Sequence, residues 1–308
     1  MQTFSPLHPI RAKRLSWYIK QLKPVAYYPL NEREGTVAYD RSAPKRTSYA
    51  VTSITRAGAV ATVTTTANHG MNTGQITEIS GAVETEYNGQ FQITVTGATT
   101  FTYAVSGTPN SPATGTILNK RDIQLDGTIT GATQGADGQV GKAYSFDGVD
   151  DYIIFTGLDP SADSFSIGFL MKRNGALDVS DRIFDQQDSG PTNGWVFDSG
   201  GSDNFNYIIK NSTTNVASIN SGALTNDVWY FVIGTYEVNS VKLFLNGSQV
   251  GSTDTNATMT SATVTPRFGV RATGEANDFK GSAQHIFVLN RVLSATEILK
   301  LAKIAGLA

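Results

Sequence analysis

The 308-residue sequence contains no cysteine and few charged residues, which make up 16% of the chain. The lack of cysteine excludes a disulfide framework, a thiolate nucleophile and a cysteine-ligated zinc site. Only three histidines occur, at positions 8, 69 and 285, which is too few and too scattered for a histidine-rich metal site. The net charge of −2 argues against nucleic acid as a partner of the whole chain.

Long apolar segments are also missing. No run of 18 apolar residues occurs, so no membrane-spanning helix is expected. The first residues, MQTFSPLHPIRAKRL, lack the continuous apolar stretch of a secretory signal. We therefore expect no membrane partner.

Residues 1–24 differ from the rest of the chain because they carry several cations and no acid. Apolar residues recur at i, i+4 and i+7, which predicts an amphipathic helix of about three turns that ends at Pro24. Such a short helix is marginal in water without a surface to lie on. One hypothesis makes it a docking segment for another protein, and the other packs it on its own domain. The docking candidates are Arg11, Arg14, Leu15, Ile19 and Leu22.

Residues 49–118 form a threonine-rich block, with 17 threonines and Arg56 as the one cation. Alternating segments such as VATVTTT, QFQITVT and TFTYAVS favour strands, because β-branched residues fit a pleated surface. Glycine- and asparagine-containing turns separate them. This block is predicted to be a small inserted β domain.

Residues 25–48 and 119–308 are predicted to form a second, discontinuous β domain. YSFDGVDDYIIF, SFSIGFLMKR, NFNYIIK and WYFVIGTYE show strand periodicity, and Asn246-Gly247 predicts a hairpin. The last segment, LSATEILKLAKIAGLA, is predicted to be a helix. Ser294 and Glu297 match a capping box, and Gly306 suits the position after the helix.

Several of these segments, in this order, resemble laminin-G-like, concanavalin A-like lectin/glucanase domains. They are YYPLNEREGTVAYDRS, GKAYSFDGVDDYIIF, SFSIGFLMKR, WYFVIGTYEVNSVKLFLNGSQVGS and FKGSAQHIFVLNRVLSATEI. The resemblance implies an all-β jelly-roll sandwich of two antiparallel sheets. The full prediction is this sandwich with an inserted small β domain and short N- and C-terminal helices.

The threonine-rich block resembles small β modules of tailed-bacteriophage tail and appendage proteins. Together with the lectin-like sandwich, this resemblance implies a non-enzymatic virion surface protein, either a head decoration or minor capsid protein or a tail appendage. Its expected partners are other virion proteins and a host-surface polysaccharide, and a homo-oligomer would follow from repeated copies on the particle. The alternatives are a tail receptor-binding lectin module and a polysaccharide-degrading enzyme.

The enzyme alternative lacks its expected motif. Sandwich glucanases place carboxylates in an E-x-D-x-E run, whose alternate residues face one groove. No such run occurs in this sequence. We therefore predict no catalytic residues.

Calcium is the one candidate cofactor, because this superfamily often binds it at a loop rim and because carboxylates are suitable ligands. The resemblance gives Asp40, Asp147, Asp150 and Asp151 as candidate ligands. The late strand that often reads G-x-I-D-D in the family is GSAQH here, at residues 281–285, and lacks the carboxylates. The alternative for the paired aspartates is turn capping.

Glycan binding would need aromatic rings that stack on sugars. Trp195, Phe205 and Tyr207 lie in or beside loops rich in asparagine, glycine, serine and aspartate and are the candidate glycan contacts. Strand alternation offers a competing place for Trp195 in the core.

Overall fold

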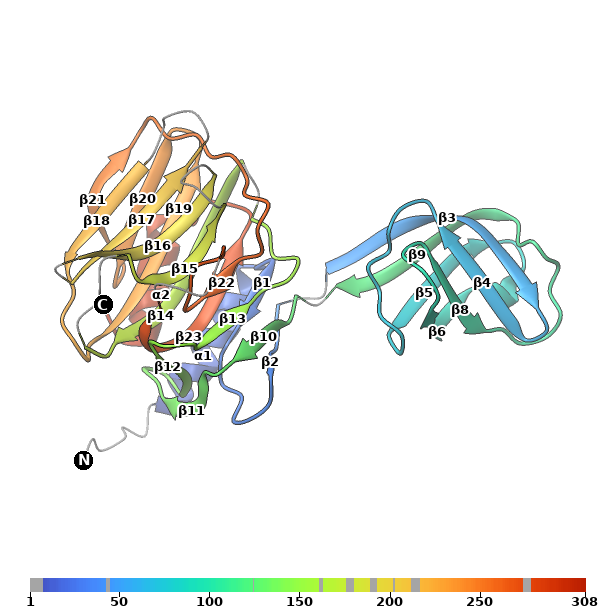
Figure 1. The fold of residues 1–308 in the computed structure, drawn as a ribbon, viewed down its shortest axis with the longest axis horizontal. Helices are drawn as coiled ribbons and strands as arrows, with labels where there is room; N and C mark the ends of the chain where they lie inside the picture. The colour runs from blue at the N-terminus through green and yellow to red at the C-terminus, as the bar shows by residue number, and fades with distance from the viewer. Residues whose placement is uncertain are drawn as a thin grey trace. The chain divides into compact units, whose positions relative to one another are not determined.

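In the computed structural model the chain forms two compact units (Figure 1). Unit 1 comprises Met1–Ala43 and Leu125–Ala308, and unit 2 comprises Pro44–Gln124. The residues described are 8–42, 45–123, 125–160, 163–175, 180–188, 193–201, 203–211, 217–273 and 278–308.

Unit 1 is built on two antiparallel sheets. Sheet A has the strand order β11 (Thr133–Asp137), β12 (Lys142–Asp147), β23 (Lys280–Leu289), β14 (Ser164–Arg173), β19 (Trp229–Glu237), β20 (Ser240–Leu245) and β21 (Ser248–Asp254), with β1 (Ala26–Tyr28) paired to β23. Sheet B has the order β18 (Ala217–Ala223), β17 (Asn204–Lys210), β16 (Gly194–Gly201), β15 (Arg182–Gln187), β22 (Arg267–Phe268), β13 (Tyr152–Ile154), β10 (Gly127–Thr130) and β2 (Val37–Ala38). The crossovers between strands distant in sequence are typical of a jelly roll.

The main core lies between the two sheets and is rich in aromatic rings. Strand alternation directs Phe165, Ile167 and Phe169 of β14 into it. Gly234 of β19 faces the opposite sheet, where a Cβ atom would lie 2.6 Å from the Phe197 ring. The sheets can approach closely at this point because glycine has no side chain.

Two helices cover the other face of sheet A. They are α1 (His8–Gln21) and α2 (Ala295–Ala305). Their apolar side chains form a second core with outward-facing residues of β14, β19, β20 and β23, among them Leu170, Phe231 and Phe287. Neither described helix is long and apolar enough to cross a membrane.

The apolar stripe of α1 is used inside unit 1. Leu15 and Ile19 are fully buried and Leu22 is 8% exposed, all in the second core. Tyr27 fixes the helix further, because its hydroxyl lies 2.6 Å from Ser16 Oγ and 2.7 Å from His285 Nδ1. The prediction that Leu15, Ile19 and Leu22 dock on another protein is therefore wrong. The competing hypothesis holds, since these side chains lie where sheet A offers an apolar face.

The cationic residues of α1 remain at the surface. Arg11 and Arg14 are exposed, so the helix shows its basic side to solvent while its apolar side faces the sandwich. For these two residues docking stays a prediction.

The α2 helix has the ends expected from the sequence. The Ser294 side chain accepts a hydrogen bond from the Glu297 backbone, and the Glu297 carboxylate accepts one from the Ser294 backbone N–H. Gly306 has φ 77°, the left-handed conformation that ends a helix. The predicted C-terminal helix and its capping box are confirmed.

Unit 2 is a β unit of seven strands with its own core around Tyr87 and Phe101. Its order is β6 (Gly89–Gln92), β5 (Ile76–Ala82), β9 (Gly115–Ile123), β3 (Lys45–Ala57), β4 (Val60–Thr65), β8 (Thr100–Ala104) and β7 (Thr94–Val95), and a 3₁₀ turn, η1, spans Thr85–Tyr87.

The strands of unit 2 extend beyond the predicted limits of 49 and 118. β3 and β9 pair as far as Lys45 and Ile123, because their backbone groups satisfy one another up to the junction. Residues assigned to sandwich loops, 45–48 and 119–123, are therefore strands of the insert. Leu125, which follows the insert, donates its backbone N–H to Asp40 of the preceding segment.

Candidate functional site

The three aromatic residues predicted to contact glycan lie in the core. Trp195 is 1% exposed, and Phe205 and Tyr207 are fully buried. On β17 the odd-numbered residues face inward, which puts both rings of that strand between the sheets. Trp195 donates its indole N–H to Gln186 Oε1 at 2.8 Å. The prediction of glycan contact at these residues is wrong, because none offers a free ring face.

The outer face of sheet B carries a row of linked polar side chains instead. Asn220 on β18 donates to Asn206 on β17 at 2.9 Å, and Asn206 donates to Asp198 on β16 at 3.1 Å. Arg182 on β15 donates to the other oxygen of Asp198 at 2.5 Å and lies 3.4 Å from Asp185. We call these five residues the polar ladder.

The polar ladder runs from solvent into the protein. Asn220 is exposed and Asn206 half-buried, whereas Asp198 is 5% and Asp185 0% exposed. Its residues occupy four adjacent strands and alternate with inward-facing core residues. The ladder thus has a solvent-exposed amide at one end and buried ion pairs at the other.

Burial shapes the charges of the ladder. It raises the pKa of Asp185 to about 6, and Arg182 opposes this rise only in part. Burial also raises the pKa of Asp198. It lowers the pKa of the neighbouring Lys210, and the charge of Arg182 adds to that effect.

An aromatic residue lies on this same sheet face. Tyr152 on β13 is half-buried and points away from the core, because its neighbour Ile153 points inward. The Arg267 guanidinium lies 5.5 Å from the centre of the Tyr152 ring. Sequence reasoning missed Tyr152 and the ladder. The period-two alternation of β13, β16 and β17 could have shown which side chains face outward.

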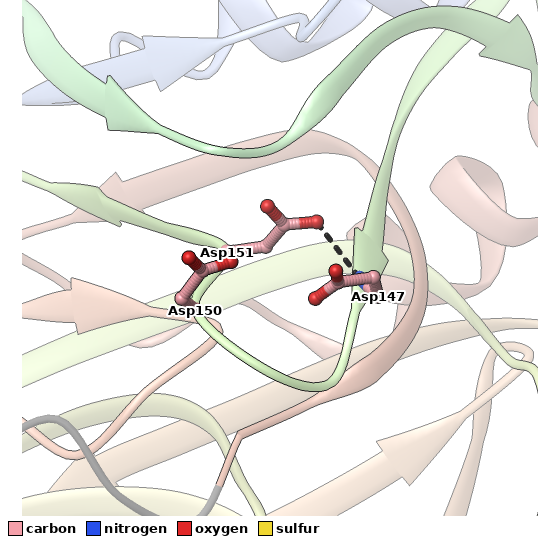
Figure 2. A group of neighbouring side chains, drawn as sticks. All are labelled: Asp147, Asp150 and Asp151. Atoms are coloured by element: carbon pink, nitrogen blue, oxygen red, sulfur yellow. Dashed lines mark hydrogen bonds between the residues drawn. The ribbon is translucent and has the colours of Figure 1, made fainter.

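Asp147, Asp150 and Asp151 come together in the turn between β12 and β13 (Figure 2). One oxygen from each carboxylate lies within 4.8 Å of the others. Asp147 donates its backbone N–H to Asp151 Oδ2 at 2.8 Å, and Asp147 Oδ1 accepts from the Val149 backbone at 2.8 Å. The turn-capping role is thus present in the structure.

The same three carboxylates fit the demands of calcium. Calcium–oxygen distances of about 2.3–2.6 Å require ligand oxygens within about 5 Å of one another. Burial raises the pKa of Asp151, and the negative charges of Asp147 and Asp150 add to the rise. A cation would relieve that repulsion. Calcium binding here remains a prediction.

Asp40 is not part of this carboxylate group. Its Oδ1 accepts the backbone N–H groups of Tyr27 and Ser42, at 2.9 and 2.8 Å. Its Oδ2 accepts from the Ser42 hydroxyl at 3.0 Å and from the Leu125 backbone at 3.3 Å. Both oxygens of Asp40 thus tie the backbone of unit 1 together, and its role as a calcium ligand stays a prediction.

Comparison with known proteins finds one family model that matches part of the sandwich. Residues 147–299 match the concanavalin A-like lectin/glucanases superfamily. The matched segment lies within unit 1 and agrees with the concanavalin A-like sandwich predicted from the sequence. No curated protein matches the sequence.

Several solved structures align with part of this chain. The binding domain of Paraclostridial Mosquitocidal Protein 1 aligns with 56% of this chain and 46% of its own, at 16% identity and a TM-score of 0.46. Domain 4 of the Geobacillus stearothermophilus arabinanase AbnA aligns with 57% of this chain and 87% of its own, at 21% identity and a TM-score of 0.45. Trypanosoma rangeli sialidase aligns with 57% of this chain and 29% of its own, at 13% identity and a TM-score of 0.44.

Calcium should stabilise the protein through Asp147, Asp150 and Asp151. At a calcium concentration about 100 times Kd, linkage predicts a gain of about 2.7 kcal/mol, seen as a higher Tm. Asp150→Asn should abolish the gain, because it removes an exposed carboxylate from the group. Asp137→Asn, an exposed carboxylate elsewhere on unit 1, is the control. A Tm that calcium leaves unchanged in the unmodified protein would contradict the prediction.

Asp185 should make stability depend on pH. Its pKa of about 6 in the folded protein lies above the ordinary 3.8, so the folded state holds the proton more tightly than the unfolded chain. The ionised group thus lowers the free energy of unfolding as pH rises through this range. A rise in pKa from 3.8 to about 6 corresponds to about 3 kcal/mol of unfolding free energy. In urea denaturation, the free energy of unfolding of Asp185→Asn relative to that of the unmodified protein should therefore rise by up to about 3 kcal/mol between pH 4 and pH 7.

The control for this experiment is Asp137→Asn, whose carboxylate is exposed. Its difference in unfolding free energy from the unmodified protein should change far less between the two pH values. If the Asp185→Asn difference also stays constant, the buried acid is not responsible for the pH dependence.

Proposed function

We propose that this protein is a non-enzymatic bacteriophage virion surface protein whose lectin-like sandwich binds a host-surface polysaccharide through the outer face of sheet B. The polar ladder on that face is the observation that carries the proposal. The two helices cover the outer face of sheet A, which leaves the outer face of sheet B as the proposed binding face. A lectin-like fold of this superfamily supports the same ligand class.

Sugar hydroxyls need paired donors and acceptors at fixed positions. Asn220 and Asn206 supply amide groups at the open end of the ladder, and their mutual hydrogen bond holds both side chains in place. The buried Asp198 and Arg182 hold Asn206 from below. Tyr152 adds a partly exposed ring on the same face, which suits stacking on a sugar.

The burial of Asp185 supports a non-enzymatic role. A pKa near 6 would suit a general acid in glycoside hydrolysis. Glycosidases, however, need two carboxylates that reach the scissile bond from either side. Asp185 is 0% exposed and lies beside Arg182, so its carboxylate does not reach a sugar bound on the surface.

The virion assignment rests on the resemblance of the threonine-rich block to phage tail and appendage modules. The structure of unit 2 as a separate β unit suits a displayed module. The two places considered for the protein are the head, as a decoration or minor capsid protein, and the tail, as a receptor-binding module. Other virion proteins, including further copies of this chain, would be its partners.

Loss of the open end of the ladder should weaken polysaccharide binding. In pull-down assays with host lipopolysaccharide and capsular polysaccharide, Asn206→Ala and Asn220→Ala should each reduce affinity about tenfold, the effect of about one lost hydrogen bond. Asn31→Ala, an exposed asparagine elsewhere in unit 1, should bind normally. Reducing sugar should not accumulate. If the folded protein retains no polysaccharide, or if sugar is released, the proposal fails.

Location on the particle is the second prediction. Mass spectrometry should find the protein in gradient-purified virions, and gold-labelled antibody should mark their surface in electron micrographs. Label on the head would make it a capsid accessory, and label on the tail tip would make it a receptor-binding module. Absence from purified particles would overturn the virion role and leave polysaccharide binding to be judged by the pull-down.

A further inference from the structure

A groove runs between α1 and α2 on the surface of unit 1. It has two adjoining hollows of about 460 and 480 Å³, which share Arg14, Lys300 and Ile304. Arg11 and Lys303 line one hollow, and Lys13 and Trp17 line the other. We call this surface the cationic groove.

The charge of the groove has one sign. Five cations line it, and none of its lining residues is acidic. They are Arg11, Lys13, Arg14, Lys300 and Lys303. Because the whole chain has a net charge of −2, the residues outside the groove carry an excess of acids.

The position of these cations works against the helix that bears them. The N-terminal end of a helix has a partial positive charge, so it favours acids and disfavours cations, most strongly in the first turn. α1 has no acid in its first turn, and Arg11, Lys13 and Arg14 occupy its first two turns. A bound anion would relieve both the mutual repulsion of the cations and their repulsion from the helix end.

The groove also has exposed apolar surface. Trp17 is 63% exposed and Ile10 is 54% exposed, beside side chains of the second core. Tryptophan and arginine are enriched among the residues that dominate binding energy at protein interfaces. Here Trp17 and Arg14 line the same hollow.

We propose that the cationic groove binds an acidic, apolar-containing segment of another protein, with Trp17 as the apolar anchor. This inference rests on the proposed function, because it names the surface by which the protein attaches to its particle. Charge complementarity selects the occupant. The excess of acids outside the groove repels an extended polyanion such as nucleic acid or an anionic membrane, whereas a short segment stays within the cationic surface.

The chain's own first residues do not match this occupant. Residues 1–7, MQTFSPL, include no acid to pair with the groove. The site therefore calls for a segment from a different polypeptide. Docking at the particle would use the outward side of α1 together with α2, while the inward side of α1 holds the helix on the sandwich.

Fluorescence anisotropy of the full-length protein tests this proposal. The probe is a fluorescein-labelled peptide of Glu-Glu-Leu repeats, and a Lys-Lys-Leu peptide of equal length is the negative control. The acidic peptide should bind, and its affinity should fall with added salt. Trp17→Ala should weaken binding about tenfold, the size of a hot-spot loss. The double variant Arg14→Glu, Lys300→Glu should weaken it more.

The matched control is Arg33→Glu, which reverses an exposed cation of unit 1 outside the groove and should bind normally. Urea denaturation of each variant confirms that it is folded, as expected for exposed positions. No binding of the acidic peptide, equal loss in Arg33→Glu, or tighter binding of oligo-dT or phosphatidylglycerol vesicles would overturn the proposal.

The groove and the sheet B face can fail independently. Groove variants should bind polysaccharide normally and be missing from purified virions, whereas Asn206→Ala should be incorporated and bind polysaccharide weakly. Normal incorporation of the double groove variant would overturn the attachment role even if the peptide binds. If the unmodified protein does not bind polysaccharide, the proposed function is contradicted but the proposal for the cationic groove is not.

Discussion

The central strands of sheet A, β14, β19 and β23, are buried on both faces, and the rest of unit 1 follows from this constraint. Their inner side chains meet sheet B, and their outer side chains meet α1 and α2. Apolar burial contributes about 25 cal/mol for each Å² removed from water, so both coverings stabilise the same strands. The amphipathic helices are thereby used within the molecule. Sheet B keeps one face for polar side chains.

The sequence predicted those features that depend on local patterns. The capping box at Ser294 and Glu297, the sandwich strands and the inserted β block all follow from spacing and composition within a short window. What periodicity could not show was the partner of each apolar surface. The stripe of Leu15 and Ile19 has the same pattern whether it meets another protein or sheet A.

The candidate site was harder to predict because it depends on pairing between strands. Asp198 and Arg182 lie 16 residues apart and meet only because β15 and β16 pair in their observed register. Loop composition pointed instead to Trp195 and Tyr207, although strand alternation places both rings inward. A shift of one residue in a strand's register moves its core rings to the outer face of the sheet and its surface amides into the core. The Asp147, Asp150 and Asp151 group was easier to find, since a single turn contains it.

The junction of the insert shows how a chain can carry a second unit without strain. Lys45 and Ile123 pair at the base of unit 2, while Asp40 accepts the backbone N–H groups of Ser42 and Leu125, on either side of the insert. Because the two ends of the insert are paired, they lie about as close together as the ends of an ordinary hairpin loop. The sandwich can therefore carry the insert without a change in its own strands. A different domain could therefore replace unit 2 at this insertion point while the lectin-like sandwich keeps its fold.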